Sequence, residues 1–234
     1  MFSLLKSHID PLSLKEKGLN ALAACLVIMT LGFVLHLLPH EKLHLPLLAS
    51  MGASAFLLFV VPHSPMAQPG PVIIGQLISA IVGLLCAHFI DNTVIAGACS
   101  VGAAVLAMEL LRSLHPPGTA TALAVGMSGA QLHDAILPFL TYAVLGNILL
   151  LLALAYLINN LLLGRRYPTG KSHHPHHEEF DNADKSGLPQ LTETDIEWAL
   201  SQMDGIVDVS KEDLIDIYEL AADYACRNQD MGKK

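Results

Sequence analysis

Long apolar stretches constrain the fold of this 234-residue chain more than any other feature. A helix of about 20 apolar residues crosses the hydrocarbon core of a bilayer, because its backbone groups bond to one another inside the helix. Five stretches reach or approach that length: residues 19–38, 45–61, 72–90, 93–111 and 136–163. The sequence therefore predicts an all-α, polytopic transmembrane helical bundle.

A sixth apolar stretch, residues 118–129, is too short to cross a bilayer unaided. Basic residues flank the whole set of spans: Lys6, Lys15 and Lys17 before it, and Arg165, Arg166 and Lys171 after it. Lys and Arg near span ends favour the cytoplasmic side, so both termini are predicted to be cytoplasmic. Two cytoplasmic ends require an even number of crossings. We therefore expect five long spans plus one short, broken segment that begins after Pro117.

The net charge of -8 belongs to the C-terminal part of the chain, where residues 171–234 hold six Lys or Arg and fifteen Asp or Glu. We expect four units: a cytosolic N-terminal segment at 1–18, a transmembrane domain at 19–168, a His-rich acidic linker at 169–190, and a small cytosolic helical hairpin at 191–228. The linker histidines, at positions 173, 174, 176 and 177, indicate either a solvated hinge or weak metal capture. The acidic charge argues against nucleic-acid binding.

Prolines, glycines and polar residues gather at two corners between the apolar stretches, residues 62–71 and 112–119. Broken helices at membrane depth line many transporter sites. The corners look like copies of each other, since Gly-Ala-Ser at 52–54 leads to His-Ser-Pro at 63–65 and Gly-Ala-Ala at 102–104 leads to His-Pro-Pro at 115–117. A true internal duplication and a coincidence both stay open; a duplication would bring the corners together near one axis.

The second corner carries the strongest candidate for a binding site. Pro117 followed by Gly118 and Thr119 is typical of a helix start, whose N–H groups attract anions. Arg112 and His115 add donors beside it. The alternative is a proline-broken turn with an arginine that reaches the headgroups.

Two further polar residues are candidates for function. Glu109 lies three residues before Arg112 in an apolar segment, so it is either half of a structural ion pair or a proton-coupling acid. His63 carries an imidazole beside Ser64 in the first corner, so it is either a functional group or a loop histidine without a role in binding.

Several motifs together resemble one known family. Gly-Ala-Ser-Ala at 52–55 with His-Ser-Pro at 63–65, Leu-His-Pro-Pro-Gly at 114–118 and Arg-Arg-Tyr-Pro at 165–168 look like the HPP family of integral membrane proteins, over most of residues 19–168. The resemblance implies a bacterial inner-membrane protein and an activity like the nitrite transport associated with chloroplast and cyanobacterial members. It also implies four membrane helices, fewer than the residues themselves predict.

These observations predict a carrier or channel for a small monovalent anion, with nitrite as the leading candidate. The predicted lining residues are His63, Ser64, Arg112, His115, Pro116, Pro117, Gly118 and Thr119, and either Glu109 or His115 would couple a proton. The alternative is a membrane-embedded sensor or scaffold that signals through the acidic hairpin. We expect no cofactor, no metal and no enzymatic activity, since HExxH and GxSxG are absent from the sequence. Spans rich in small residues are compatible with a homodimer.

Overall fold

The computed structural model describes residues 13–37, 44–128, 136 and 139–169, together with residues 209, 214, 215, 217 and 218. Within these residues the regular elements are helical. Of the predicted N-terminal segment, linker and hairpin, the described residues are 13–18, residue 169, and residues 209, 214, 215, 217 and 218; the rest of these three units lies outside the described residues.

The helix bounds follow the apolar stretches closely. The long elements are α1 (Leu14–His36), α2 (His44–Val60), α3 (Pro69–Phe89) and α4 (Thr93–Leu110), followed by the short α5 (Pro117–Met127). The last helix is continuous but has three parts: π-helical η5 (Phe139–Gly146), α7 (Asn147–Leu157) and π-helical η6 (Ile158–Leu162). A 3-10 turn, η3 (Pro65–Ala67), lies in the first corner.

Four of the described helices are long and apolar enough to cross a membrane: Leu14–Val34, Pro69–Phe89, Thr93–Leu110 and Phe139–Leu162. The expected short segment also forms a helix, α5, of 11 residues. However, α2 has only 17 residues and is shorter than these four, so the predicted count of five long spans is not confirmed.

Local sequence explains where the helices begin. At the start of α1, the Ser13 N–H donates to Glu16 Oε2 at 2.8 Å and the Glu16 N–H donates to Ser13 Oγ at 3.3 Å. This reciprocal capping box places the start of α1 at Leu14, before the apolar stretch itself. Proline occupies the first turn of α3 and of α5, where its missing N–H removes no helical bond.

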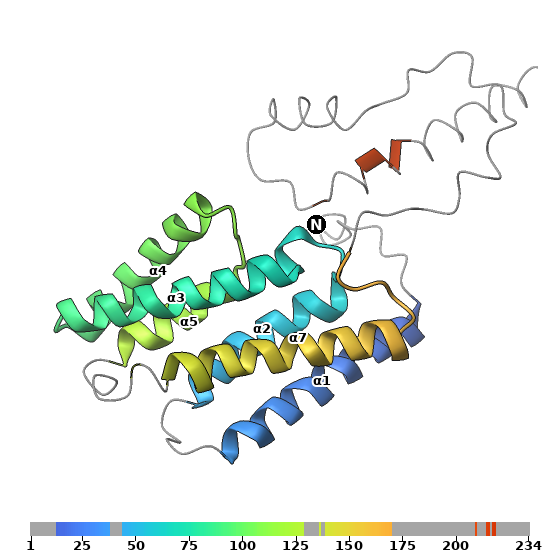
Figure 1. Ribbon diagram of the computed structural model, residues 1–234, viewed down its shortest axis with the longest axis horizontal. Coiled ribbons are helices and arrows are strands. Elements are labelled where there is room, and N and C mark those ends of the chain that lie inside the picture. The colour runs from blue at the N-terminus through green and yellow to red at the C-terminus, as the bar shows by residue number, and fades with distance from the viewer. Residues whose placement is uncertain are drawn as a thin grey trace, which may run out of the picture.

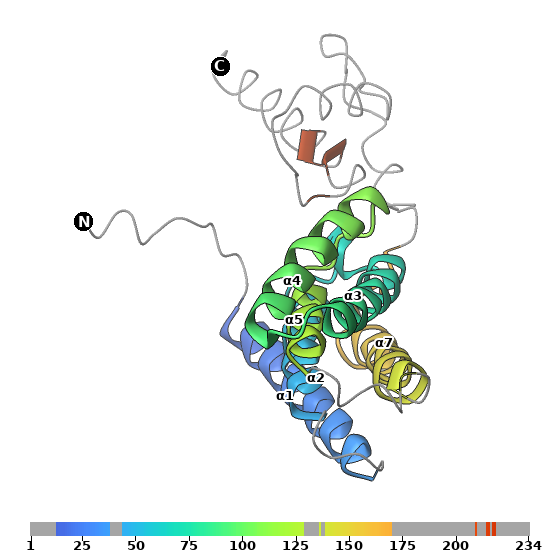
Figure 2. The same cartoon turned by 90° about the vertical axis from the view of Figure 1, so that its left-hand side faces the viewer.

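The short α5 occupies the centre of the bundle. It packs against α2, α3 and α4, while α1 packs against α2 and α7 (Figures 1 and 2). Close approach depends on glycine: a Cβ added to Gly83 of α3 would lie 2.8 Å from Val125 Cβ and 3.0 Å from the Ala122 carbonyl oxygen of α5. The backbones of α3 and α5 are therefore almost in contact.

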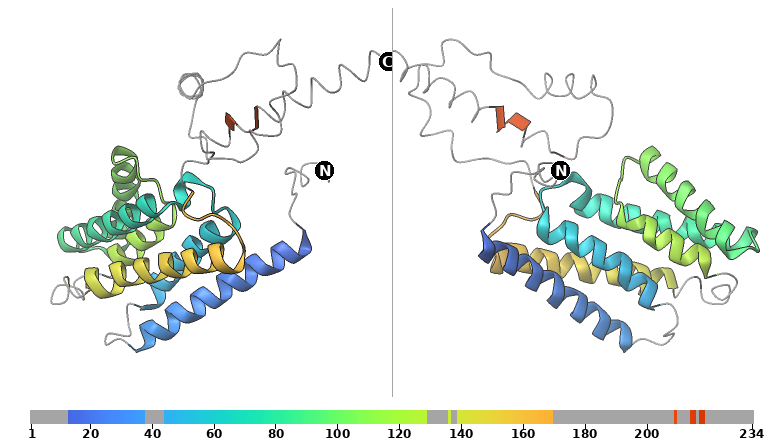
Figure 3. Two further views of the ribbon diagram at one scale, coloured as in Figure 1. Left: turned by 45° about the vertical axis from the view of Figure 1, so that its right-hand side comes forward. Right: turned by 180° about the vertical axis from the view of Figure 1, so that it is seen from behind.

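The first helix begins near the point where the last helix ends. The start of α1 and the end of η6 lie at the same end of the bundle (Figures 1 and 3). There Arg165 Nη2 donates to Asn20 Oδ1 of α1 at 2.8 Å, and Nη1 donates to the Phe59 carbonyl of α2 at 2.8 Å. One guanidinium group thus joins the chain after the last helix to the first two helices.

Candidate functional site

The two proline-rich corners meet at one end of α5. In the first corner, Ser64 Oγ accepts a hydrogen bond from the Met66 N–H at 3.1 Å and caps η3. Gln68 Nε2 donates to the carbonyls of Pro62 and Ser64, each at 3.0 Å, and so closes the turn. The Met66 carbonyl oxygen then lies 2.9 Å from His115 Nδ1 in the second corner.

His115 is fully buried and bonded at both ring nitrogens. Its Nδ1 faces a carbonyl oxygen, which only accepts, so we assign the proton to Nδ1. Its Nε2 lies 2.8 Å from Ser54 Oγ, in the middle of α2. A Cβ on Gly75 would lie 2.7 Å from His115 Cβ, so α3 leaves room for the imidazole only because position 75 is glycine.

The hydrogen bonds continue from Ser54 into the bundle. Gln76 Nε2 donates to Ser54 Oγ at 3.2 Å, and Gln76 Oε1 accepts from Thr121 Oγ1. Thr121 Oγ1 also lies 2.8 Å from Ser50 Oγ. We call these five residues the buried polar cluster; each has an exposed fraction of 0%: Ser50, Ser54, Gln76, His115 and Thr121.

Three helices and one corner supply this cluster. Ser50 and Ser54 come from α2, Gln76 from α3, Thr121 from α5, and His115 from the corner before α5. Its members offer hydroxyl, amide and imidazole groups, and none of the five is a carboxylate, a lysine or an arginine. Polar groups buried among apolar helices are stable when they bond to one another, as these do.

The start of α5 is more closed than the sequence predicts. The Gly118 N–H donates to the His115 carbonyl at 2.8 Å, and the Thr119 N–H donates to the Pro116 carbonyl at 3.0 Å. Thr119 Oγ1 bonds to the same Pro116 carbonyl at 2.7 Å. These backbone donors, which we expected to face an anion, are therefore bonded within the turn.

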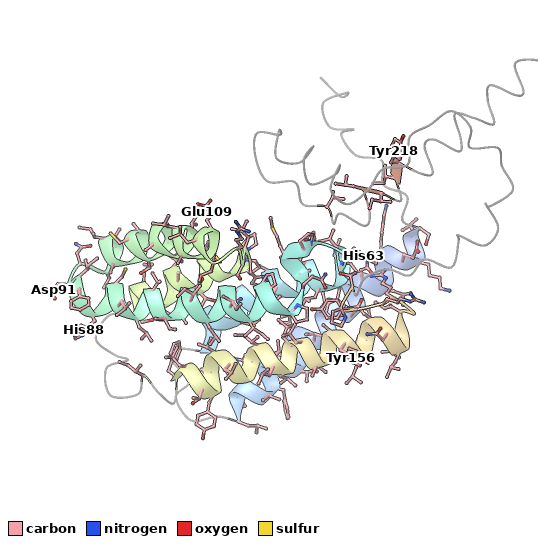
Figure 4. All side chains as sticks on the ribbon, turned by 45° about the horizontal axis from the view of Figure 1, so that its top comes forward. His63, His88, Asp91, Glu109, Tyr156 and Tyr218 are labelled. Carbon is pink, nitrogen blue, oxygen red and sulfur yellow. The ribbon has the colours of Figure 1, made fainter. Side chains whose placement is uncertain are left out.

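The charged candidates lie outside the cluster. Glu109 and Arg112 are both exposed, and Glu109 lies on the outer side of α4 (Figure 4). Of the two alternatives for Glu109, the ion pair with Arg112 is not formed between these two described residues; their bond is from the Arg112 N–H to the Glu109 carbonyl, at 3.0 Å. His63 is exposed at the end of the bundle, whereas Ser64 beside it is buried.

Sequence reasoning found His115 but missed its partners. Ser50 and Ser54 are one helical turn apart on α2, and Gln76 interrupts an otherwise apolar stretch. Polar residues inside apolar spans were the signal that could have found them. Within the described part of the chain, no three His, Cys, Asp or Glu side chains gather as metal ligands.

A second set of bonds holds the first corner from the outside. The Tyr167 hydroxyl donates to the Ala67 carbonyl at 2.9 Å, and the Thr169 N–H donates to Gln68 Oε1 at 3.1 Å. Tyr167 is 2% exposed. We call residues 164–169 the strap, because they tie the end of the last helix to the corner that carries the Met66 carbonyl.

Comparison with known proteins places these features in one family. The family model of the HPP transmembrane region matches residues 9–168, a span that contains the buried polar cluster and almost the whole strap. The chain belongs to the HPP family. This HPP protein thus spans the membrane with multiple apolar helices, as the sequence resemblance predicts.

Two relatives are transmembrane proteins of Dictyostelium discoideum. One is 34% identical over 159 residues, which are 66% of this chain and 51% of that protein. The other is 33% identical over 159 residues, 66% of this chain and 55% of that protein. This HPP protein therefore matches about half the length of each relative. No solved structure matches the chain significantly.

Proposed function

We propose that this HPP protein carries a small monovalent anion across a bacterial inner membrane, with both termini cytoplasmic and nitrite as the leading substrate. The observation that carries the proposal is the buried polar cluster between α2, α3 and α5. Intramembrane polar groups are costly, so a set that gathers where a short helix begins at a proline-rich corner is a functional candidate.

The chemistry of the cluster suits an anion of low charge. Hydroxyl and amide groups can donate hydrogen bonds in place of the water that an anion loses, and the cluster has no carboxylate to repel it. Its one ionisable member is His115. One imidazolium balances one negative charge, which favours a monovalent anion over a divalent one.

The burial of the cluster favours a carrier over an open channel. All five members have an exposed fraction of 0%, so an ion reaches them only after helices move. The short α5 begins at the second corner and contacts α2, α3 and α4. It is therefore our candidate for the helix that moves.

Nitrite flux into proteoliposomes tests the proposal. We compare the purified wild-type chain with His115→Gln, with protein-free vesicles, and with the matched control His88→Gln. His88 is exposed in the last turn of α3, at the end away from the two corners (Figure 4). Measurements near neutral pH keep nitrous acid, and hence leakage, scarce.

We expect wild-type and His88→Gln vesicles to take up nitrite faster than protein-free vesicles, and His115→Gln to fall at least about tenfold toward leakage, since it loses the group that can carry charge. Wild-type flux no faster than leakage would contradict nitrite transport. The sensor or scaffold function would then become the leading proposal.

A further inference from the structure

We infer that His115 takes up one proton for each anion that the buried polar cluster binds, so that the protein is a one-to-one proton–anion cotransporter with Ser54 as the residue that accommodates both charge states. The inference rests on the proposed function and names its coupling ion. The hydrogen-bond geometry around Ser54 carries it.

The Ser54 hydroxyl has one hydrogen and two acceptors within reach. His115 Nε2 lies 2.8 Å from Ser54 Oγ, and the Ser50 carbonyl oxygen lies 3.1 Å from it. With a neutral imidazole, the hydroxyl donates to Nε2. With a protonated imidazole, Nε2–H donates to Ser54 Oγ, and the hydroxyl turns to the Ser50 carbonyl.

The remaining contacts of His115 fit both states without change. The Met66 carbonyl accepts from Nδ1–H whether or not Nε2 is protonated. Gln76 Nε2 donates to Ser54 Oγ, which keeps a lone pair for Nε2–H because its own hydrogen points elsewhere. Rotation of one hydroxyl therefore keeps every donor satisfied as His115 gains a charge.

Bound charge is what makes the proton uptake necessary. An isolated anion among fully buried neutral groups is expensive, and so is an isolated imidazolium, whereas the two together neutralise each other. The proton enters with the anion from one aqueous side and leaves with it on the other. No net charge crosses the membrane in a complete cycle.

Other ionisable groups around His115 are poorly placed to take this proton. The cluster members from α2, α3 and α5 are serine, glutamine and threonine. On α3, Cys86 and His88 lie in the last turn, at the end away from the corner. Three groups near the two corners are exposed: His63, Glu109 and Arg112.

Equilibrium binding with proton counting tests the inference without transport. Nitrite is added to the purified full chain in weakly buffered detergent solution near neutral pH. Bound nitrite is measured by dialysis and proton uptake by an indicator dye. We expect about one proton taken up per nitrite bound, in excess of a protein-free blank.

Variants at two buried serines sharpen the test. Ser54→Ala removes the hydroxyl oxygen that accepts a hydrogen bond from the protonated His115 Nε2. We therefore expect nitrite affinity to fall at least about tenfold. Ser100→Ala is the matched control, because Ser100 is equally buried but bonds to the Ala96 carbonyl within α4. The wild-type proton count does not depend on either variant folding.

The outcomes separate the two proposals. Nitrite binding without proton uptake overturns the cotransport inference and leaves anion transport standing. Equal nitrite affinity in Ser54→Ala and Ser100→Ala overturns the part assigned to Ser54. Absence of nitrite binding by the folded wild-type chain overturns both proposals.

Discussion

His115 Nε2 and Ser54 Oγ lie 2.8 Å apart although 61 residues separate them in the sequence. This bond joins the His-Pro-Pro corner to the middle of α2 and closes a set of bonds that also includes Gln76 of α3. Because both groups are fully buried, neither can turn to water if the other is removed. The family motif is therefore tied to the packing of three helices.

Arg112 occupies a backbone conformation that favours glycine. Its φ is 50°, and the Ser113 N–H bonds to the Met108 carbonyl at 2.9 Å, a helix ending in which glycine usually fills this position. A side chain there costs roughly 1 kcal/mol. We expect Arg112→Gly to raise the free energy of unfolding by about that amount, measured by thermal unfolding in detergent.

Substitutions of Arg112 also separate its effect on stability from its effect on transport. If the Arg112 charge attracts the anion, nitrite flux falls in Arg112→Gly and Arg112→Gln but persists in Arg112→Lys. Unchanged flux in a stabilised Arg112→Gly protein would remove Arg112 from the transport pathway.

Gly118 and Gly102 make a matched pair for testing the packing of α5. A Cβ at Gly118 would lie 2.7 Å from Ser79 Oγ and 2.9 Å from the Gly75 carbonyl oxygen, whereas a Cβ at Gly102 meets nothing within 4 Å. We expect Gly118→Ala to destabilise the protein by about 1–3 kcal/mol. Gly102→Ala should be neutral or slightly stabilising. Equal melting temperatures for the two variants would contradict the close approach of α5 to α3.

Tyr167 should make stability depend on alkaline pH. Burial raises the pKa of its phenol above the ordinary value of 10.0. The folded state then holds a proton that the unfolded state loses, so this contribution is complete below pH 10 and falls as the pH rises above it. We expect Tyr167→Phe to weaken that alkaline loss and, by removing the bond to Ala67, to cost about 1 kcal/mol at neutral pH.

Tyr156→Phe is the control for this experiment, since Tyr156 lies on α7, before the strap, and is 53% exposed. Denaturation in detergent between neutral pH and pH of about 11 covers the range in which a free phenol titrates. Identical pH profiles for wild type and Tyr167→Phe would show that the phenol does not titrate with unfolding.

Glu109 provides a negative prediction. Its side chain is exposed on the outer side of α4 and outside the cluster (Figure 4). We expect Glu109→Gln to keep the number of protons taken up per nitrite bound, because that proton goes to His115. A loss of proton uptake in this variant would move the coupling group from the corner to α4.

Hydropathy located the helices well because apolar length decides which segments can enter a bilayer. The stretch predicted at 93–111 corresponds to α4 at Thr93–Leu110, and that at 72–90 to α3 at Pro69–Phe89. The differences arise from local rules, such as proline in the first turn of α3 and the capping box before α1. The count of five long spans is not confirmed, because α2 has 17 residues and is shorter than the four helices that are long enough to span a membrane.

The site was less predictable than the helices. Proline and glycine marked both corners, but the partners of His115 depend on contacts between distant segments, which spacing does not encode. Glu109 shows the same limit: α4 is apolar around most of its circumference, so the sequence does not tell which face contacts α3 and α5. Its exposure became visible only with the helices packed together.

The strap connects the end of the last helix mechanically to the buried imidazole. The Tyr167 hydroxyl donates a hydrogen bond to the Ala67 carbonyl, and the neighbouring Met66 carbonyl accepts one from His115 Nδ1. A partner that shifted the strap would therefore alter the hydrogen bonding of His115. Thermodynamic reciprocity then requires that an anion in the cluster alter the affinity for such a partner by the same factor, so a contact at the strap would report whether the site is occupied.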